Sequence, residues 1–67
     1  MYKDKQETIR YAFNSFGFLI EDYLTLTIKD FSKLIKKHYN NDRVNYICNV
    51  LDNTEGQVTN KKIEYYV

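Results

Sequence analysis

Apolar residues recur at intervals of three and four positions in three stretches of the 67-residue chain, the spacing of one face of an α-helix. The first stretch covers about 4–16, the second follows Thr27 and ends before the polar cluster 40–42, and the third covers 41–51. The second and third stretches each carry an apolar stripe that must leave water, so we expect them to pack together. The stripe residues are Ile28, Phe31, Leu34 and Ile35 in the second stretch and Val44, Ile47, Cys48 and Leu51 in the third.

Polar residues mark where these helices should begin. Thr27 precedes Asp30 by three positions, which approximates a capping box. The cluster 40–42, Asn-Asn-Asp, favours a turn and the start of a new helix, because these side chains compete with helical backbone hydrogen bonds. We therefore predict three short helices, with Phe31 and Ile47 near the centre where they meet.

The segment between the first and second helices breaks the helical pattern. Gly17 is a stop signal, and the apolar run 18–20 is too short for a helix, so we interpret it as a buried link. Residues 23–26, Tyr-Leu-Thr-Leu, alternate in a way that favours β-structure. A short strand or extended segment is therefore predicted just before Thr27.

The C-terminal residues 57–67 are typical of a β-hairpin. Residues 58–59 suit one strand and 63–67 the other, with Asn60–Lys61 as the turn, although this pair lacks the glycine that a type I′ turn prefers. Gly56, just before the hairpin, is free to adopt a positive φ. In the second strand the alternation places Ile63, Tyr65 and Val67 on one face and Glu64 and Tyr66 on the other.

The length indicates one domain covering residues 1–67, and the predicted helices, strand and hairpin make it α+β. A chain of this size buries only about 60% of its unfolded surface, which leaves little room for a small-molecule cleft. Hydrophobic residues make up 43% of the sequence, enough for a compact core. No linker, repeat or low-complexity segment suggests a second domain.

The sequence also bears on where the protein acts. It has no signal-peptide pattern and no apolar run near the length of a membrane span, so we expect no membrane association and a cytoplasmic location. Asn, Lys, Tyr and Ile are frequent and Pro is absent, as expected for AT-rich coding DNA. This composition fits a low-GC bacterium or a phage that infects one.

Charge leaves the kind of partner open. The formal net charge is only +1, whereas domains that bind nucleic acid usually have a clear basic excess. The positive residues are nevertheless partly gathered, and both a solvated helix face and a phosphate-binding surface explain them. This basic cluster consists of Lys29, Lys33, Lys36, Lys37, His38 and Arg43.

The predicted order of helix, short strand, helix, turn, helix and hairpin resembles the winged helix-turn-helix family. The resemblance covers the run LTIKDFSKLIKKHYNNDRVNYICNVLDNTEGQVTNKKIEYYV, residues 26–67. It implies that 41–51 is a recognition helix whose outward residues include Asp42, and that the hairpin is a wing. Arginine and asparagine suit such a helix because they can bond guanine and adenine edges. The residues that this resemblance and the basic cluster suggest for nucleic-acid binding are Lys36, Lys37, Arg43, Asn45, Tyr46, Asn49, Lys61 and Lys62.

Catalytic and metal-binding chemistry is poorly represented. His38 is the only histidine and Cys48 the only cysteine, so they cannot form a zinc site by themselves, and Cys48 fits the core as a small apolar residue. Neither Ser15 nor Ser32 has a base adjacent in sequence, and the two glycines stand too far apart for a phosphate-binding loop. We expect a protein that is not an enzyme and uses no metal or cofactor.

Seven tyrosines suggest a second class of function. Tyrosine is enriched at protein interfaces because it combines a rigid apolar ring with a polar tip, although half-buried tyrosines on a small domain are also ordinary. The interface interpretation predicts a phage- or mobile-element-encoded inhibitor that blocks a host protein, and a homodimer is equally compatible with it. The candidate protein-binding residues are Tyr39, Tyr46 and Tyr66.

Overall fold

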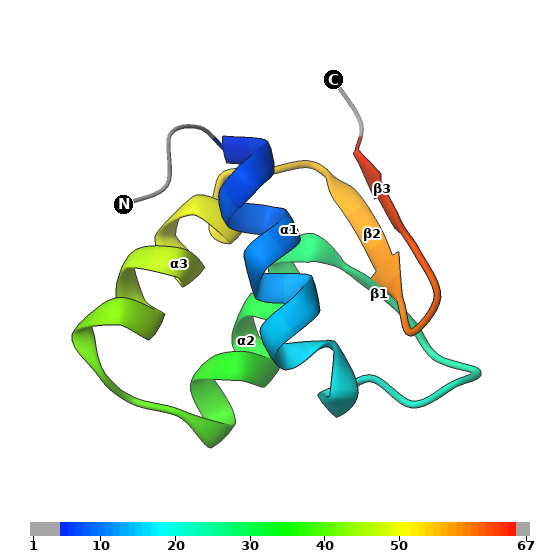
Figure 1. Ribbon diagram of the computed structural model, residues 1–67, viewed down its shortest axis with the longest axis horizontal. Coiled ribbons are helices and arrows are strands. Elements are labelled where there is room, and N and C mark those ends of the chain that lie inside the picture. Colours follow the sequence, from blue (N-terminus) through cyan, green and yellow to red (C-terminus); the bar gives the residue numbers. More distant parts are fainter. Residues whose placement is uncertain (1–4, 66–67) are drawn as a thin grey trace.

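The computed structural model describes residues 5–65, and within them three α-helices pack beside a small antiparallel sheet (Figure 1). The α+β class predicted from the sequence is thus confirmed. The elements in chain order are α1 (Lys5–Phe16), the 3-10 helix η1 (Gly17–Leu19), β1 (Thr25–Thr27), α2 (Ile28–His38), α3 (Asp42–Asp52), β2 (Gly56–Thr59) and β3 (Ile63–Tyr65).

Both predicted helix starts are capped by side chains. Thr27 Oγ1 accepts a hydrogen bond of 3.0 Å from the backbone N–H of Asp30, and Asn41 Oδ1 accepts one of 2.9 Å from the N–H of Val44. Each cap satisfies a donor that the helix itself leaves unpaired. Local sequence signals therefore set the starts of α2 and α3.

The core lies where the three helices meet the inner face of the sheet. Phe31 and Ile47 are fully buried, as predicted, and Phe31 is the largest fully buried side chain. Helix α1 contributes one side of this core and contacts α3, while α2 packs against α3, β1 and β2. The buried apolar residues are Ile9, Ala12, Ile20, Ile28, Phe31, Ile35, Val44, Ile47, Cys48, Leu51 and Val58.

A reciprocal pair of hydrogen bonds joins α2 to α3 inside the core. The Ser32 hydroxyl donates to the backbone carbonyl of Cys48 at 3.4 Å, and the Cys48 thiol donates to the carbonyl of Ser32 at 3.6 Å. Burial raises the pKa of the Cys48 thiol, although the bond with Ser32 and the charge of Lys36 oppose the rise. Cys48 is thus held as a neutral thiol, in agreement with its predicted role as a core residue.

The sheet order is β1-β2-β3, with both neighbouring pairs antiparallel. Leu26 pairs with Val58, and Val58 pairs in turn with Ile63. The first strand begins later than predicted, at Thr25, because the chain turns through a hydrogen bond of 2.9 Å from Leu24 N–H to the Glu21 carbonyl. Pairing with β2, which is distant in sequence, decides these strand limits.

The prediction that residues 18–20 form a buried link is wrong for Phe18, which is 69% exposed. Phe18 and Leu19 lie in η1, whose 3-10 geometry has three residues per turn, and Ile20 is its C-cap. Gly17 and Ile20 therefore lie on the same side, joined by a hydrogen bond of 3.0 Å, and both are buried. Phe18 points to the opposite side of this short helix.

The hairpin turn at Asn60–Lys61 forms as predicted. Thr59 N–H donates to the Lys62 carbonyl at 2.9 Å, so the flanking residues close a two-residue turn. No non-glycine residue among those described has a positive φ, so the turn is not type I′. The Thr59 hydroxyl supports it instead, accepting hydrogen bonds of 3.1 Å from the N–H groups of Lys61 and Lys62. Gly56 adopts the predicted positive φ, at 149°.

Candidate docking surface on helix α3

Helix α3 presents one polar face to solvent, because its other face carries the four apolar residues that join the core. The outward residues are Asp42, Arg43, Asn45, Tyr46 and Asn49, all exposed as expected. Within residues 5–65, the side chains of Arg43, Asn45 and Asn49 make no hydrogen bond or ion pair. Their donors and acceptors are thus available to a ligand. We call the five outward residues together the α3 face.

The basic cluster of α2 is only partly available to an external partner. Lys29 forms an ion pair of 2.9 Å with Glu55, and Lys36 forms one of 3.0 Å with Asp52 at the end of α3. These hydrogen bonds raise the pKa of both lysines. Lys36, predicted to contact nucleic acid, therefore already lies beside a carboxylate, whereas Lys37 is exposed and has no ion pair in the described part of the chain.

Asp52 couples the ends of α2 and α3 electrostatically. Partial burial raises its pKa, but the hydrogen bond from Lys36 and the charges of Lys36 and Lys33 outweigh that effect. The pKa of Asp52 is therefore lowered, and this side chain stays ionised at neutral pH. Since it faces cations of the basic cluster, it reduces the positive potential of the surface beside α3.

The hairpin lysines lie apart from the α3 face. In Figure 1, α3 lies at the left of the molecule and the hairpin at the right, with α1 and α2 between them. Lys61 and Lys62 instead line a hollow shared with Arg10, Phe13 and Asn14 of α1. Lys62 also forms an ion pair of 3.3 Å with Glu64. The structure thus divides the predicted nucleic-acid residues between two surfaces.

The predicted protein-binding tyrosines have different surroundings. Tyr46 is 43% exposed on the α3 face, and Tyr39 is 37% exposed just after α2. The Tyr39 ring packs against Phe16, with 5.2 Å between the ring centroids, so part of this side chain has a structural role. Tyr66 lies outside the residues that the structure describes.

A group of exposed apolar residues before β1 was missed by sequence reasoning. Phe18, Tyr23 and Leu24 are 69%, 84% and 36% exposed. A side-chain hydrogen bond between Asn60 and Asp22 ties this segment to the hairpin turn. Periodicity did not separate these residues from core residues, because their exposure depends on how the linker turns.

The described residues contain no group of three or more His, Cys, Asp or Glu side chains placed to hold a metal ion. In the same residues, no helix combines the length and apolarity needed to cross a membrane. No protein-family model, curated protein or solved structure matches the chain. The described residues form a small α+β domain, with the α3 face and the hairpin lysines on separate parts of its surface.

Proposed function

We propose that this protein is a small regulatory binding module of winged-helix type that docks on duplex DNA through the α3 face. The observation that carries the proposal is the exposed set Arg43, Asn45 and Asn49, whose side chains have no partner within residues 5–65. Guanidinium and amide groups can form paired hydrogen bonds with guanine and adenine edges in the major groove. The order of helices and strands, the same as in winged helix-turn-helix domains, supports this role for α3. In this proposal the protein acts by binding alone.

The proposal uses fewer contact residues than the sequence suggested. Lys37, at the last turn of α2, and Arg43, in the first turn of α3, flank the connection between these helices and would contact phosphates and bases respectively. Lys36 and Lys62 are engaged in ion pairs, and the hairpin that carries Lys61 and Lys62 lies away from α3. The proposed contact residues are Lys37, Arg43, Asn45, Tyr46 and Asn49.

Two substitutions test this assignment. Arg43→Ala should weaken binding to a preferred duplex by about 1 to 3 kcal/mol and relax sequence preference, whereas Lys37→Ala should weaken binding to all duplexes alike. Arg10→Ala is the matched control, because Arg10 is an exposed arginine on α1 outside the α3 face. Fluorescence anisotropy with labelled duplexes measures these effects. Equal losses from Arg43→Ala and Arg10→Ala would contradict the proposal.

The exposure of Tyr39 and Tyr46 favours a second candidate, a protein-docking surface. The low net charge fits this candidate too, since it limits attraction to phosphates. The protein would then be an inhibitor, encoded by a phage or mobile element, that covers a surface of a host protein. A second copy of the chain is another possible occupant, and sedimentation equilibrium would detect it through a concentration-dependent mass.

Tyr46→Ala tests the protein-docking candidate. If this side chain is an anchor, the substitution should cost the complex about 2 kcal/mol or more and leave the melting midpoint nearly unchanged. Tyr23→Ala is the matched control, because Tyr23 is 84% exposed on the linker. Affinity capture of a host protein followed by calorimetry measures both variants. Wild-type affinity of Tyr46→Ala would remove this side chain from the interface.

A further inference from the structure

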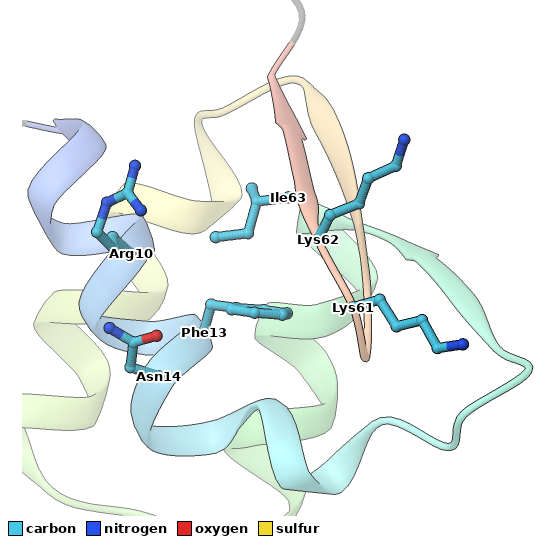
Figure 2. A pocket seen from close by; sticks show the side chains of 6 residues that line it. All are labelled: Arg10, Phe13, Asn14, Lys61, Lys62 and Ile63. Atoms are coloured by element: carbon cyan, nitrogen blue, oxygen red, sulfur yellow. The ribbon is translucent and has the colours of Figure 1, made fainter.

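A hollow with a volume of about 270 Å³ lies between α1 and the hairpin (Figure 2). It is separate from the α3 face, which lies across the molecule. Three of its lining residues come from α1 and three from the hairpin turn and β3. They are Arg10, Phe13 and Asn14 from α1 and Lys61, Lys62 and Ile63 from the hairpin.

The centre of the hollow is apolar. Figure 2 shows Phe13 extending from α1 toward the hairpin and Ile63 extending from β3 toward α1, and both are half-buried. The backbone of Gly17 lies against the Phe13 ring, since a Cβ at Gly17 would be 3.6 Å from the nearest ring atoms. One side of the ring is thus supported by η1. This packing leaves an apolar surface that another apolar side chain can cover.

The rim of the hollow is positively charged on both sides. Arg10 lies on the α1 side and Lys61 and Lys62 on the hairpin side, and Figure 2 shows their charged groups directed outward rather than into the centre. The lining contains no carboxylate, and Glu64 neutralises only Lys62. The side chains of Arg10 and Lys61 form no ion pair within residues 5–65. An occupant should therefore carry negative charge on either side of an apolar group.

The unpaired edge of strand β3 favours an occupant with an extended backbone. It is an outer strand of the sheet in the order β1-β2-β3, and within the described residues no strand pairs with its far edge. Ile63 of β3 lines the hollow, so a side chain of an extended chain paired with this edge could lie beside Ile63. The unpaired N–H and C=O groups of an edge strand can accept a further extended chain.

We propose that this hollow binds an extended acidic peptide segment of a partner protein. One apolar side chain of the segment lies between Phe13 and Ile63, its carboxylates lie beside Arg10 and Lys61, and its backbone continues along the edge of β3. A nucleic-acid strand would satisfy the charged rim but lacks the alternating N–H and C=O groups that pair with a strand. This site does not depend on what the α3 face binds.

Synthetic peptides test the site directly with the whole 67-residue chain. The first peptide has a central leucine flanked by glutamates, the second replaces the leucine with glycine, and the third keeps the leucine but replaces the glutamates with glutamines. Two-dimensional NMR of the labelled protein should show that only the first peptide binds well. Its addition should shift the amide signals of Arg10, Asn14 and Ile63 while leaving those of Asn45 and Asn49 in place.

Charge substitutions complete the test. Arg10→Gln and Lys61→Gln each remove a rim charge from an exposed side chain and should weaken binding of the first peptide at least about threefold. Lys33→Gln is the matched control, because Lys33 is exposed on α2 away from the hollow, and it should bind like the wild type. The proposal is overturned if the glutamine peptide binds equally well, if both rim variants keep wild-type affinity, or if the shifted signals lie on α3. A single-stranded oligonucleotide that shifts the same signals more strongly than the peptide also overturns it.

Discussion

Replacing Phe31 with alanine should remove much of the stability of this domain. Phe31 is the largest side chain with no solvent exposure, and it lies in the core formed by the three helices and the sheet. A Phe→Ala change at such a site costs about 3 to 5 kcal/mol. At roughly 0.05 to 0.15 kcal/mol per residue, a domain of this size has only about 3 to 10 kcal/mol in total. The variant should therefore be largely or partly unfolded at room temperature.

Phe18→Ala supplies a matched control for the same chemical change. Phe18 is 69% exposed, so its truncation should change the free energy of unfolding by less than about 0.5 kcal/mol. Circular dichroism during thermal and urea unfolding measures both variants. For this size of domain each kcal/mol corresponds to about 4 to 8 °C in melting midpoint. A Phe31→Ala protein that melts cooperatively near the wild-type midpoint would refute the assigned core.

Three further predictions concern local interactions. Thr27→Ala and Asn41→Ala should each cost about 1 kcal/mol in urea unfolding, because each removes a helix-capping acceptor, while Thr27→Ser should cost less. The pKa of Asp52 is lower in the folded protein than in the unfolded chain, so below about pH 4 the unfolded chain binds more protons at this group than the folded protein does. The stabilisation that ionised Asp52 supplies is therefore lost as pH falls through its folded-state pKa. Asp52→Asn should accordingly flatten the acid part of the stability–pH curve and leave the slope near neutral pH unchanged. Cys48 is fully buried and should react with a thiol reagent only as urea unfolds the protein; rapid labelling of the native state would contradict this.

The helices were predictable because their signals are local. The hydroxyl of Thr27 and the amide of Asn41 cap helices within three residues of themselves, and the apolar spacing of α2 and α3 places Phe31 and Ile47 in the core. The exposed residues of α3 follow from the same periodicity. Helix ends and helix faces could therefore be derived from the sequence alone.

Most of the errors concern features that depend on residues distant in the sequence. The limits of β1 are set by pairing with β2. The exposure of Phe18 is a local exception, since it follows from the 3-10 geometry of the linker. Lys36 is engaged by Asp52, sixteen positions later, which a count of basic residues along the chain does not reveal. The hollow between α1 and the hairpin likewise joins segments whose proximity only the fold establishes.

The salt dependence of binding to duplex DNA tests the central proposal most directly. Lys37 and Arg43 are the two cations among the proposed contact residues, and neither has an ion pair in the described residues, so binding should neutralise about one or two phosphates. The slope of log K against log salt should then be about −1 to −2, and Lys37→Ala should make it less negative by about 1. Absence of binding to any duplex at low salt would contradict the DNA proposal and leave the protein-docking candidate.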